Sequence, residues 1–489
     1  MAGIVTVFMN GRETVVSAYD GELLSDVLLR AGVHTAQPCG GRGICGKCLV
    51  RGVGGIRKLK EAPEGYYLAC KSVVEGDAKV WFGEEKTKIV SSSIFAFDET
   101  NKENGLALAV DIGTTTIAAY LIDLTNGETM LVETALNPQR AHGADVISRI
   151  SFALEDGNTD ILKNEIQTAL DNMERSLLSR ADRKSEEIIR RVLVGNTAMT
   201  HMACGYSVLG ISKAPFSPKY YGAHMVSWNG SDALIGGCIS GYVGSDTISA
   251  LLACGLDKRE ECALMIDIGT NGEIALVKDG EILTCSCAAG PAFEGAHIAC
   301  GTGAVNGAIN TARIDNGKMS FTTIGDKEPI GICGSGLIDL VAELFENEEI
   351  TPAGRMAQDY PLTENVYLAR GDVREVQLAK AAIAAGIRIL MNEMHAEYDD
   401  IDKVYLAGGF GSFINIENAC KIGMLPEELK ERIVPVGNAA GAGAGMMAMS
   451  AEMRKRSEDI RMNARYVELA AHEDFPDLFA ENLIIGTEE

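Results

Sequence analysis

The chain has 489 residues, which is enough for roughly two or three domains with sizeable cores. Its formal net charge of -24 argues against nucleic acid and anionic membranes as partners, because both attract lysine and arginine. No apolar run reaches the roughly 18 residues of a membrane span, and the segment from Met1 to Arg12 lacks a targeting pattern. We therefore expect a cytoplasmic protein whose 13 cysteines are ligands, core residues or reactive thiols rather than disulfides.

Residues 1–84 predict a small β-rich domain. The strand-like runs from Ile4 to Met9 and from Thr14 to Ser17 flank an Asn-Gly dipeptide, which is a strong hairpin signal. The segment from Gly21 to Ala31 carries leucine and valine at helical spacing and is followed by a glycine. Residues 85–105 mix serine, asparagine and charged residues, which is typical of a linker.

Four cysteines of this domain have the spacing of an iron–sulfur site. Three follow the pattern C-x5-C-x2-C in one glycine-rich loop and a fourth comes later: Cys39, Cys45, Cys48 and Cys70. Such clusters take four thiolates, and glycines allow the loop N–H groups to point at the cluster sulfides. Zinc is the alternative, although it usually takes two C-x2-C pairs. We expect a [2Fe–2S] cluster, in a loop whose spacing is similar to ferredoxins of the adrenodoxin type.

From Leu106 onward, strands and helices alternate, which indicates an α/β fold. One unit occurs twice, an apolar strand that ends in an Asp-Ile-Gly-Thr turn and is followed by a second strand, at Asp111 and at Asp267. A repeated hairpin predicts a duplicated architecture with two facing lobes. We assign residues 106–260 to lobe I and 261–489 to lobe II, with the C-terminal segment returning to lobe I.

The two hairpin turns carry what a phosphate chain and Mg²⁺ require, namely backbone N–H groups, hydroxyls and a carboxylate. Asp111 and Asp267 are the expected carboxylates, although aspartate after a strand is also a common turn cap. The turn residues expected to bind phosphate are Gly113, Thr114, Thr115, Gly269, Thr270 and Asn271. A later glycine turn, which would let adenosine approach the backbone, contains Gly408, Gly409 and Gly411. Neither a Walker A loop nor a Rossmann fingerprint is present.

The hairpins and the glycine turn resemble the ASKHA superfamily, which includes acetate and sugar kinases, Hsp70 and actin. The whole chain resembles more closely the reductive activators of corrinoid enzymes. Segments that carry this resemblance include 192–201, 241–246, 331–339, 377–383 and 437–443. Longer members of that family carry an additional segment between the ferredoxin and ATPase parts, for which residues 85–105 leave no room.

This resemblance implies an α+β, β-grasp ferredoxin-like domain followed by a two-lobed α/β actin-like domain of the duplicated ribonuclease-H type. It implies an ATP-hydrolysing iron–sulfur reductase that passes one electron to the Co(II) corrinoid of a methyltransferase-system partner and regenerates Co(I). The implied cofactors are the [2Fe–2S] cluster, ATP and Mg²⁺, and a low-potential donor supplies the electron. Because the chain lacks an Asp-x-His-x-x-Gly pattern, the corrinoid should belong to the partner protein. Homodimerisation through the ASKHA domain is a question that the resemblance leaves open.

Some residues have two interpretations. Asp246 either caps the helix that it begins or orients a metal ion or a water molecule. Gln377 and Lys380 match positions where relatives contact adenosine, and a solvated helix face is an equal alternative. Core packing is favoured over a second cluster, of the kind that dehydratase activators hold between subunits, for four further cysteines: Cys285, Cys287, Cys300 and Cys333.

Two other functions stay open at this point. One is ATP-dependent electron activation of a different low-potential metalloenzyme, such as a 2-hydroxyacyl-CoA dehydratase. The other is a small-molecule kinase whose cluster senses the redox state, although the catalytic aspartate of sugar kinases has no clear counterpart here. A chaperone function is disfavoured because the sequence leaves no segment for a substrate-binding domain.

Overall fold

The computed structural model describes residues 3–9, 12–31, 33, 35, 48–60, 62, 65–82, 103–228, 230–411 and 413–486. The predicted Asn-Gly turn, the cysteine loop up to residue 47 and most of the predicted linker lie outside the described residues. The chain divides into two compact units, Met1–Lys88 with Pro138–Ala144 and Ile89–Asn137 with Asp145–Glu489. Within the described ranges, no helix combines the length and the hydropathy needed to cross a membrane.

The described residues of the first unit contain a mixed β-sheet packed against the α-helix α1. Its elements are β1 (Gly3–Met9), β2 (Arg12–Ala18), β3 (Glu22–Leu23), α1 (Leu24–Arg30), β4 (Leu49–Lys58), β5 (Tyr66–Leu68), η1 (Ala69–Lys71) and β6 (Ser72–Phe82). The sheet order is β2-β1-β6-β4-β5, and β1 pairs antiparallel with β2 but parallel with β6. Helix α1 buries Leu24, Val27 and Leu28 in the same core as sheet residues such as Val5. The expected α+β ferredoxin-like arrangement is confirmed.

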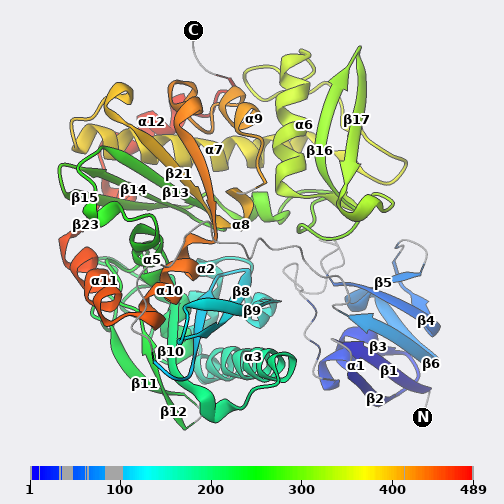
Figure 1. Cartoon of the computed structure of the whole chain (residues 1–489). Coiled ribbons are helices and arrows are strands. Elements are labelled where there is room, and N and C mark those ends of the chain that lie inside the picture. The colour runs from blue at the N-terminus through cyan, green and yellow to red at the C-terminus, as the bar shows by residue number, and fades with distance from the viewer. Residues whose placement is uncertain are drawn as a thin grey trace. The chain divides into compact units, whose positions relative to one another are not determined.

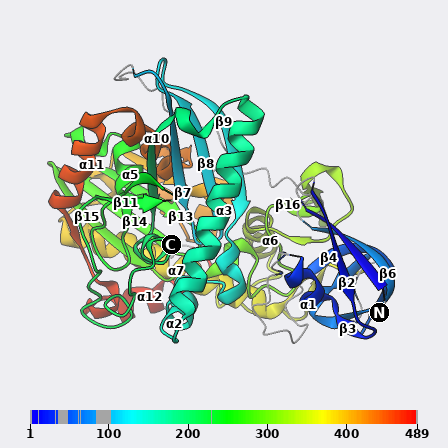
Figure 2. The same cartoon turned by 90° about the horizontal axis from the view of Figure 1, so that it is seen from below.

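Lobe I of the second unit is built on a six-stranded sheet with the order β11-β12-β10-β7-β8-β9. Its elements are β7 (Leu106–Ile112), β8 (Thr116–Asp123), β9 (Glu128–Leu136), α2 (Val146–Ala153), α3 (Asn158–Ala181), β10 (Ile188–Gly195), α4 (Thr197–Cys204), β11 (His224–Trp228), β12 (Ser231–Ile235) and α5 (Ser245–Ala253). Helix α3 covers the outer face of this sheet (Figure 2).

Lobe II repeats this plan, with the sheet order β22-β21-β13-β14-β15-β23. Its sheet strands are β13 (Ala263–Ile268), β14 (Gly272–Lys278), β15 (Glu281–Cys287), β21 (Lys403–Ala407), β22 (Ile433–Gly437) and β23 (Ala464–Tyr466). Its helices are η5 (Pro291–Glu294), α6 (Gly334–Glu346), α7 (Arg370–Glu393), α8 (Gly408–Gly411), α9 (Ile416–Lys421), α10 (Ala439–Met449), α11 (Ala451–Asn463) and α12 (Phe475–Glu481). A side subdomain contains β16 (Ala308–Asp315), β17 (Lys318–Thr323) and β18 (Gly331–Ile332). The predicted duplication is confirmed.

Both sheets use the two-residue period of a strand to face two different cores. In β7, Ala107 and Ala109 face inward, whereas the larger Leu108 and Val110 face α3. In β13, Met265 faces inward and its neighbours face the outer core of lobe II. Small inward residues leave room for α5 and α10, which lie between the two sheets in the inner core (Figure 1).

Helix α10 follows β22 of lobe II but packs on α5, β7 and β10 of lobe I. The chain then returns to lobe II, where β23 pairs with β15 and α12 packs on α7. Two glycines allow α10 to approach its neighbours closely. A Cβ added at Gly443 would lie 2.0 Å from the Ser249 carbonyl oxygen, and one at Gly441 would lie 2.6 Å from the Tyr120 ring.

Replacing Gly443 by alanine should therefore destabilise the second unit. Its methyl group overlaps backbone of α5, which a side-chain rotation cannot relieve, so we expect a loss of about 2–3 kcal/mol in the free energy of unfolding. The measurement is urea unfolding followed by circular dichroism. Gly371→Ala in α7 is the matched control, because a Cβ there meets nothing within 4 Å and alanine favours a helix by up to about 1 kcal/mol. Equal stability of the two variants would contradict the close α5–α10 packing.

Candidate functional site

The first hairpin turn, between β7 and β8, is held by two asparagine amides. A Cβ added at Gly113 would lie 2.4 Å from the Thr116 carbonyl oxygen, so the tight turn requires glycine. Asn137 Nδ2 donates to the Gly113 carbonyl oxygen at 2.8 Å. Asn196 Nδ2 donates to Thr114 Oγ1 at 3.0 Å, while its Oδ1 caps helix α4. These contacts fix the turn whose hydroxyls were predicted to bind phosphate.

The second hairpin turn, between β13 and β14, lies against the glycine turn of α8. The Gly269 N–H donates to the Asn271 carbonyl oxygen at 2.9 Å, and Thr270 is buried. Gly408 has a φ of +91°, and a Cβ there would lie 2.6 Å from Asp267 Oδ1. Nothing lies within 4 Å of a Cβ built on Gly409. The structure thus brings the predicted phosphate turn and the predicted adenosine turn together at Asp267.

Three predicted aspartates and one glutamate form an acidic site, defined here as Asp111, Asp246, Asp267 and Glu273. The aspartates are half-buried and Glu273 is buried. Burial, and to a smaller extent repulsion from Asp246, raises the pKa of Asp111 to about 7. Burial, with smaller contributions from repulsion by Asp246 and Asp111, raises the pKa of Asp267 to about 7. Loss of water also raises the pKa of Asp246 to about 6 and that of Glu273 well above its ordinary value. Sequence reasoning missed Glu273, which lies in β14 directly opposite Asp267.

Helix N-termini hold two of these carboxylates. Asn438 caps α10 by accepting the Gly441 N–H at 2.7 Å, and its Nδ2 donates to Asp111 Oδ2 at 2.9 Å. Asp246 lies in the first turn of α5, and its Oδ1 accepts the Thr247 N–H at 2.8 Å. The N-cap of α5 is Gly244, so the alternative that Asp246 is the N-cap is wrong. A helix N-terminus favours negative charge, which partly offsets the repulsion in the acidic site.

A glutamate that sequence reasoning also missed joins the two hairpin turns. Thr115 Oγ1 and Thr270 Oγ1 donate to the same oxygen, Glu294 Oε2, at 2.5 Å and 2.7 Å. The two hydroxyl oxygens are 3.2 Å apart. Thr115 belongs to lobe I and the other two residues to lobe II, so this contact connects the lobes.

Gln377 and Lys380 are buried on α7, so the solvated-face alternative is wrong. Gln377 Nε2 donates to the Leu483 carbonyl oxygen at 2.6 Å, and burial lowers the pKa of Lys380 to about 8. A Cβ added at Gly423 would lie 3.1 Å from Lys380 Nζ. Both side chains contact parts of lobe II that the sequence did not place beside α7. Their predicted contact with adenosine stays a prediction.

A cavity of about 600 Å³ lies beside the segment that follows the glycine turn. Phe413 and Asn415 from that segment line it, together with Asp339 of α6 and residues of β16 and β17. The Phe413 N–H donates to the Phe410 carbonyl oxygen at 3.0 Å, so the turn leads directly into the cavity wall. Phe413 is 51% exposed, which leaves an aromatic surface available to a flat ligand.

Two of the four predicted cluster ligands are described. Cys48 and Cys70 are buried, and their sulfur atoms are 3.2 Å apart, well beyond the roughly 2.05 Å of a disulfide. The Ala69 N–H donates to the Cys48 carbonyl oxygen at 2.9 Å, which ties the two ligand segments together. Cys39 and Cys45 lie outside the described residues. Two converging thiols fit half of a four-thiolate site.

Three of the four other predicted cysteines are core residues in the described structure, and the fourth, Cys300, is half-buried against the same core. Cys285, Cys287 and Cys333 are buried, and burial raises the pKa of the Cys287 thiol to about 12. A thiol with such a pKa is a poor metal ligand because the thiolate is the ligating form. Among the described residues, no group of three or more His, Cys, Asp and Glu side chains is arranged to hold a metal ion.

The pKa shifts predict how stability depends on pH. Folded Asp246 keeps its proton up to about pH 6, whereas the unfolded chain loses it near pH 4, so its contribution to stability falls as pH rises between these values. Asp246→Asn should therefore raise the free energy of unfolding at pH 7.5 by about 1–2 kcal/mol and change it little at pH 4.5. Urea unfolding without divalent cations measures this difference. Asp232→Asn, at an exposed position of the same lobe, should show no such pH dependence.

Comparison with protein families covers almost the whole chain. Residues 261–489 match the C-terminal domain of RACo, described as the ASKHA domain. Residues 106–259 match the RACo middle region, and residues 7–75 match the 2Fe-2S iron–sulfur cluster binding domain. The expected ferredoxin and ASKHA folds are thus confirmed independently of the structure.

Individual relatives show the same pattern. The chain is 31% identical to the corrinoid activation enzyme RamQ of Eubacterium limosum, over 88% of this chain and 79% of that protein. It is 26% identical to a Co(II) methylated amine-specific corrinoid protein reductase of Methanosarcina barkeri, over 78% of this chain and 77% of that protein. A solved reductive activator for a corrinoid, iron–sulfur protein superimposes with a TM-score of 0.72 at 26% identity and covers 98% of both chains. The chain therefore belongs to the RACo family of corrinoid activation enzymes.

Proposed function

We propose that this chain is an ATP-dependent reductive activator that passes one electron to the Co(II) corrinoid of a partner protein and regenerates Co(I). The observation that carries the proposal is the similarity to RamQ through both the ferredoxin and the ASKHA parts. An electron carrier and an ATPase in one chain are needed together only if hydrolysis drives electron transfer. The names of both curated relatives support a corrinoid protein as the acceptor.

Electron transfer to Co(II) is uphill, which explains the need for ATP. When bound, a [2Fe–2S] cluster supplies a one-electron carrier with a potential near about -400 mV. Co(I) formation requires a lower potential, and every 59 mV costs about 1.4 kcal/mol for one electron. The electron balance is simple, since one electron leaves the reduced carrier and one enters Co(II). A nucleotide can drive this step only by binding differently to two states of the protein.

The chain's own residues divide this work between the two units. The thiolates of Cys39, Cys45, Cys48 and Cys70 hold the cluster. In the ASKHA domain, the N–H groups and side chains of the two turns bind phosphate: Gly113, Thr114, Thr115, Gly269, Thr270 and Asn271. In this proposal Asp246 orients the attacking water and accepts its proton, and a pKa of about 6 leaves its carboxylate ionised at neutral pH.

Mg²⁺ fits the acidic site if the phosphate chain of the nucleotide supplies part of its coordination shell. Mg²⁺ usually retains several waters and takes only one or two carboxylates together with phosphate oxygens. Asp111 and Asp267 supply those carboxylates in this proposal, so a three-ligand protein site is unnecessary. A divalent cation would also relieve the repulsion that raises the pKa of both aspartates.

The cavity at Phe413 supports a location for the adenine base. With phosphates at the hairpin turns, Gly408, Gly409 and Gly411 give the nucleoside a path along the backbone toward this cavity. Stacking on the exposed Phe413 ring would hold the base there. Gln377 and Lys380 stay candidate adenosine contacts, predicted from resemblance alone.

Other parts of the proposal rest on the sequence. We propose the domain limits 1–84, 85–105, 106–260 and 261–489, a cytoplasmic location and a low-potential electron donor. We also propose homodimerisation through the ASKHA domain, which the molecular mass of the protein in solution would test.

The functional test joins both units. With a low-potential reductant, Mg-ATP and a Co(II) corrinoid protein, the anaerobic protein should generate Co(I), followed by its absorption band and by loss of the Co(II) EPR signal. Asp267→Asn should keep a reducible cluster but lower ATP turnover at least about 100-fold, because a preorganised charge at the phosphate is lost. Cys70→Ser should still hydrolyse ATP but form no Co(I).

These two variants separate the two activities within one chain. Co(I) formation at an unchanged rate without nucleotide would contradict the proposal. ATP-driven activation of a 2-hydroxyacyl-CoA dehydratase, with no activity toward any corrinoid protein, would replace it with the alternative acceptor. Iron and sulfide analysis of Cys70→Ser shows whether its failure comes from cluster loss.

Removing the Phe413 ring should weaken nucleotide binding without changing the chemistry. We expect Phe413→Ala to raise the KM for ATP about tenfold at nearly unchanged kcat, since stacking on a base contributes about 1–3 kcal/mol. Steady-state ATPase kinetics provide the measurement. Met462→Ala, which removes a side chain that is 60% exposed on α11, is the control. An unchanged KM in Phe413→Ala would exclude this cavity as the base site.

A further inference from the structure

Glu294 occupies the place where the two predicted phosphate turns meet. One carboxylate oxygen accepts hydrogen bonds from Thr115 Oγ1 and Thr270 Oγ1, at 2.5 Å and 2.7 Å. Each threonine hydroxyl has a single hydrogen, and both hydrogens are used in these contacts. Neither hydroxyl can donate to a phosphate oxygen while Glu294 stays in place.

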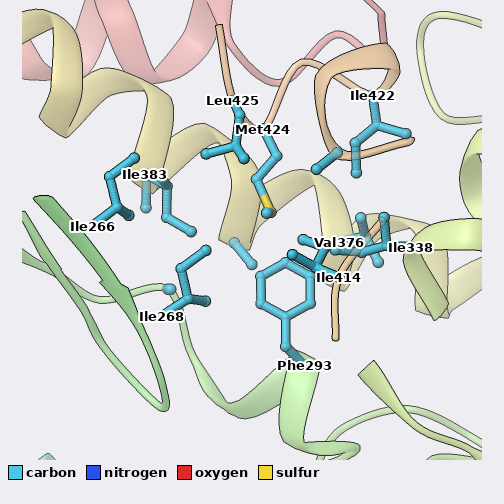
Figure 3. Packing of buried hydrophobic residues seen from close by; sticks show 14 of the residues in the cluster. Ile266, Ile268, Phe293, Ile338, Val376, Ile383, Ile414, Ile422, Met424 and Leu425 are labelled. Atoms are coloured by element: carbon cyan, nitrogen blue, oxygen red, sulfur yellow. The ribbon is translucent and has the colours of Figure 1, made fainter. Parts of the chain in front are cut away.

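The main chain of Glu294 is held firmly by its surroundings. Its neighbour Phe293 points into the outer core of lobe II, alongside Ile268, Val376 and Ile414 (Figure 3). The Phe293 ring also stacks on Phe410 of the glycine turn, with ring centroids 5.0 Å apart. Only the side chain of Glu294 is therefore free to change partners, because Phe293 anchors the turn that carries it.

Close backbone contacts at two glycines also hold the turn that contains Glu294. A Cβ added at Gly334 would lie 2.1 Å from the Phe293 carbonyl oxygen. A Cβ added at Gly295 would lie 2.5 Å from backbone atoms of Thr302, and Gly295 has a φ of +75°. The backbone on both sides of Glu294 is thus packed against other backbone, which sets the reach of its carboxylate toward the two hydroxyls.

A carboxylate oxygen and a phosphate oxygen are equivalent ligands for hydroxyl donors, since both are anionic acceptors. They also repel each other at short range, most strongly where water is partly excluded. A phosphate that reaches Thr115 and Thr270 must therefore displace Glu294. The Glu294 carboxylate thus occupies the position that a phosphate oxygen would take at these two hydroxyls.

We propose that Glu294 is an internal competitor of the nucleotide phosphates and sets how strongly the site distinguishes nucleotides by their phosphate chain. This inference rests on the proposed ATP-binding function. In the nucleotide-free protein the Glu294 carboxylate accepts the hydrogen bonds of both threonine hydroxyls and thereby links lobe I to lobe II. Binding of a β- or γ-phosphate displaces it, which releases that link and transfers the donors to the ligand. Glu294 is a positioning residue in this scheme and takes no part in bond cleavage.

The test compares ligands of increasing phosphate number on wild type and Glu294→Gln. Titration calorimetry with adenosine, AMP, ADP and a non-hydrolysable ATP analogue, each with Mg²⁺, gives the dissociation constants. Glutamine keeps the size of the side chain but removes the charge that repels phosphate. We expect about tenfold tighter binding of ADP and of the ATP analogue, as for loss of a charge-assisted hydrogen bond in the free state, and unchanged binding of adenosine and AMP.

The controls separate this inference from the proposed function. Wild type that binds no nucleotide would refute the ATP site itself, whereas wild-type binding with no gain in Glu294→Gln would refute only the competitor role. An equal gain for AMP and ADP would also overturn it, because a general change in the site does not depend on phosphate number. Glu328→Gln removes an exposed carboxylate of the same lobe and should change none of the constants. If Glu294→Gln does not fold, Glu294→Asp should show the same order of ligands, because the shorter side chain cannot reach both hydroxyls.

Discussion

The rest of this structure depends on the confinement of like charges in the acidic site. Asp111, Asp246 and Asp267 approach one another with little water between them, and their pKa values rise toward neutrality. Such a site opposes folding unless protons, a cation or oriented dipoles compensate its charge. The asparagine cap of α10 and the first turn of α5 supply dipoles, and in the proposed function a cation arrives with the nucleotide. The charge repulsion that lowers the stability of the nucleotide-free protein therefore favours binding of a cation to the acidic site.

The duplicated fold explains how residues far apart in sequence reach this site. Each lobe presents a hairpin turn from its central strands, and each lobe sends one helix between the sheets. Alanines on the inner faces and glycines in α10 let these helices approach closely enough for Asn438 and Asp246 to face the turns. Glu294 and the Phe293–Phe410 stack connect the second turn to the glycine turn. The site is thus assembled from both lobes at once.

Features encoded locally could be predicted from the sequence. The hairpins at Asp111 and Asp267 were recognisable because strand, turn and strand follow one another within a few residues. Asn196 and Asn438 were missed because a helix cap and a site contact share one side chain, and only the cap has a local signal. Glu294 was missed because its partners Thr115 and Thr270 come from two other segments. The burial of Gln377 could not be predicted, since it depends on Leu483 from the end of the chain.

The position of α10 has a consequence for how the protein is made. The inner face of the lobe I sheet is covered in part by α10, which lies more than 200 residues later than the last strand of that sheet, since β12 ends at Ile235 and α10 begins at Ala439. While the ribosome is still adding lobe II, lobe I has an apolar surface without its natural cover, and such surfaces promote aggregation. The sheet and helix α1 of the first unit have no such dependence, because α1 and β1 to β6 are contiguous in the chain. Nascent chains should therefore acquire a cluster-binding domain early and require chaperone protection until the last helices emerge.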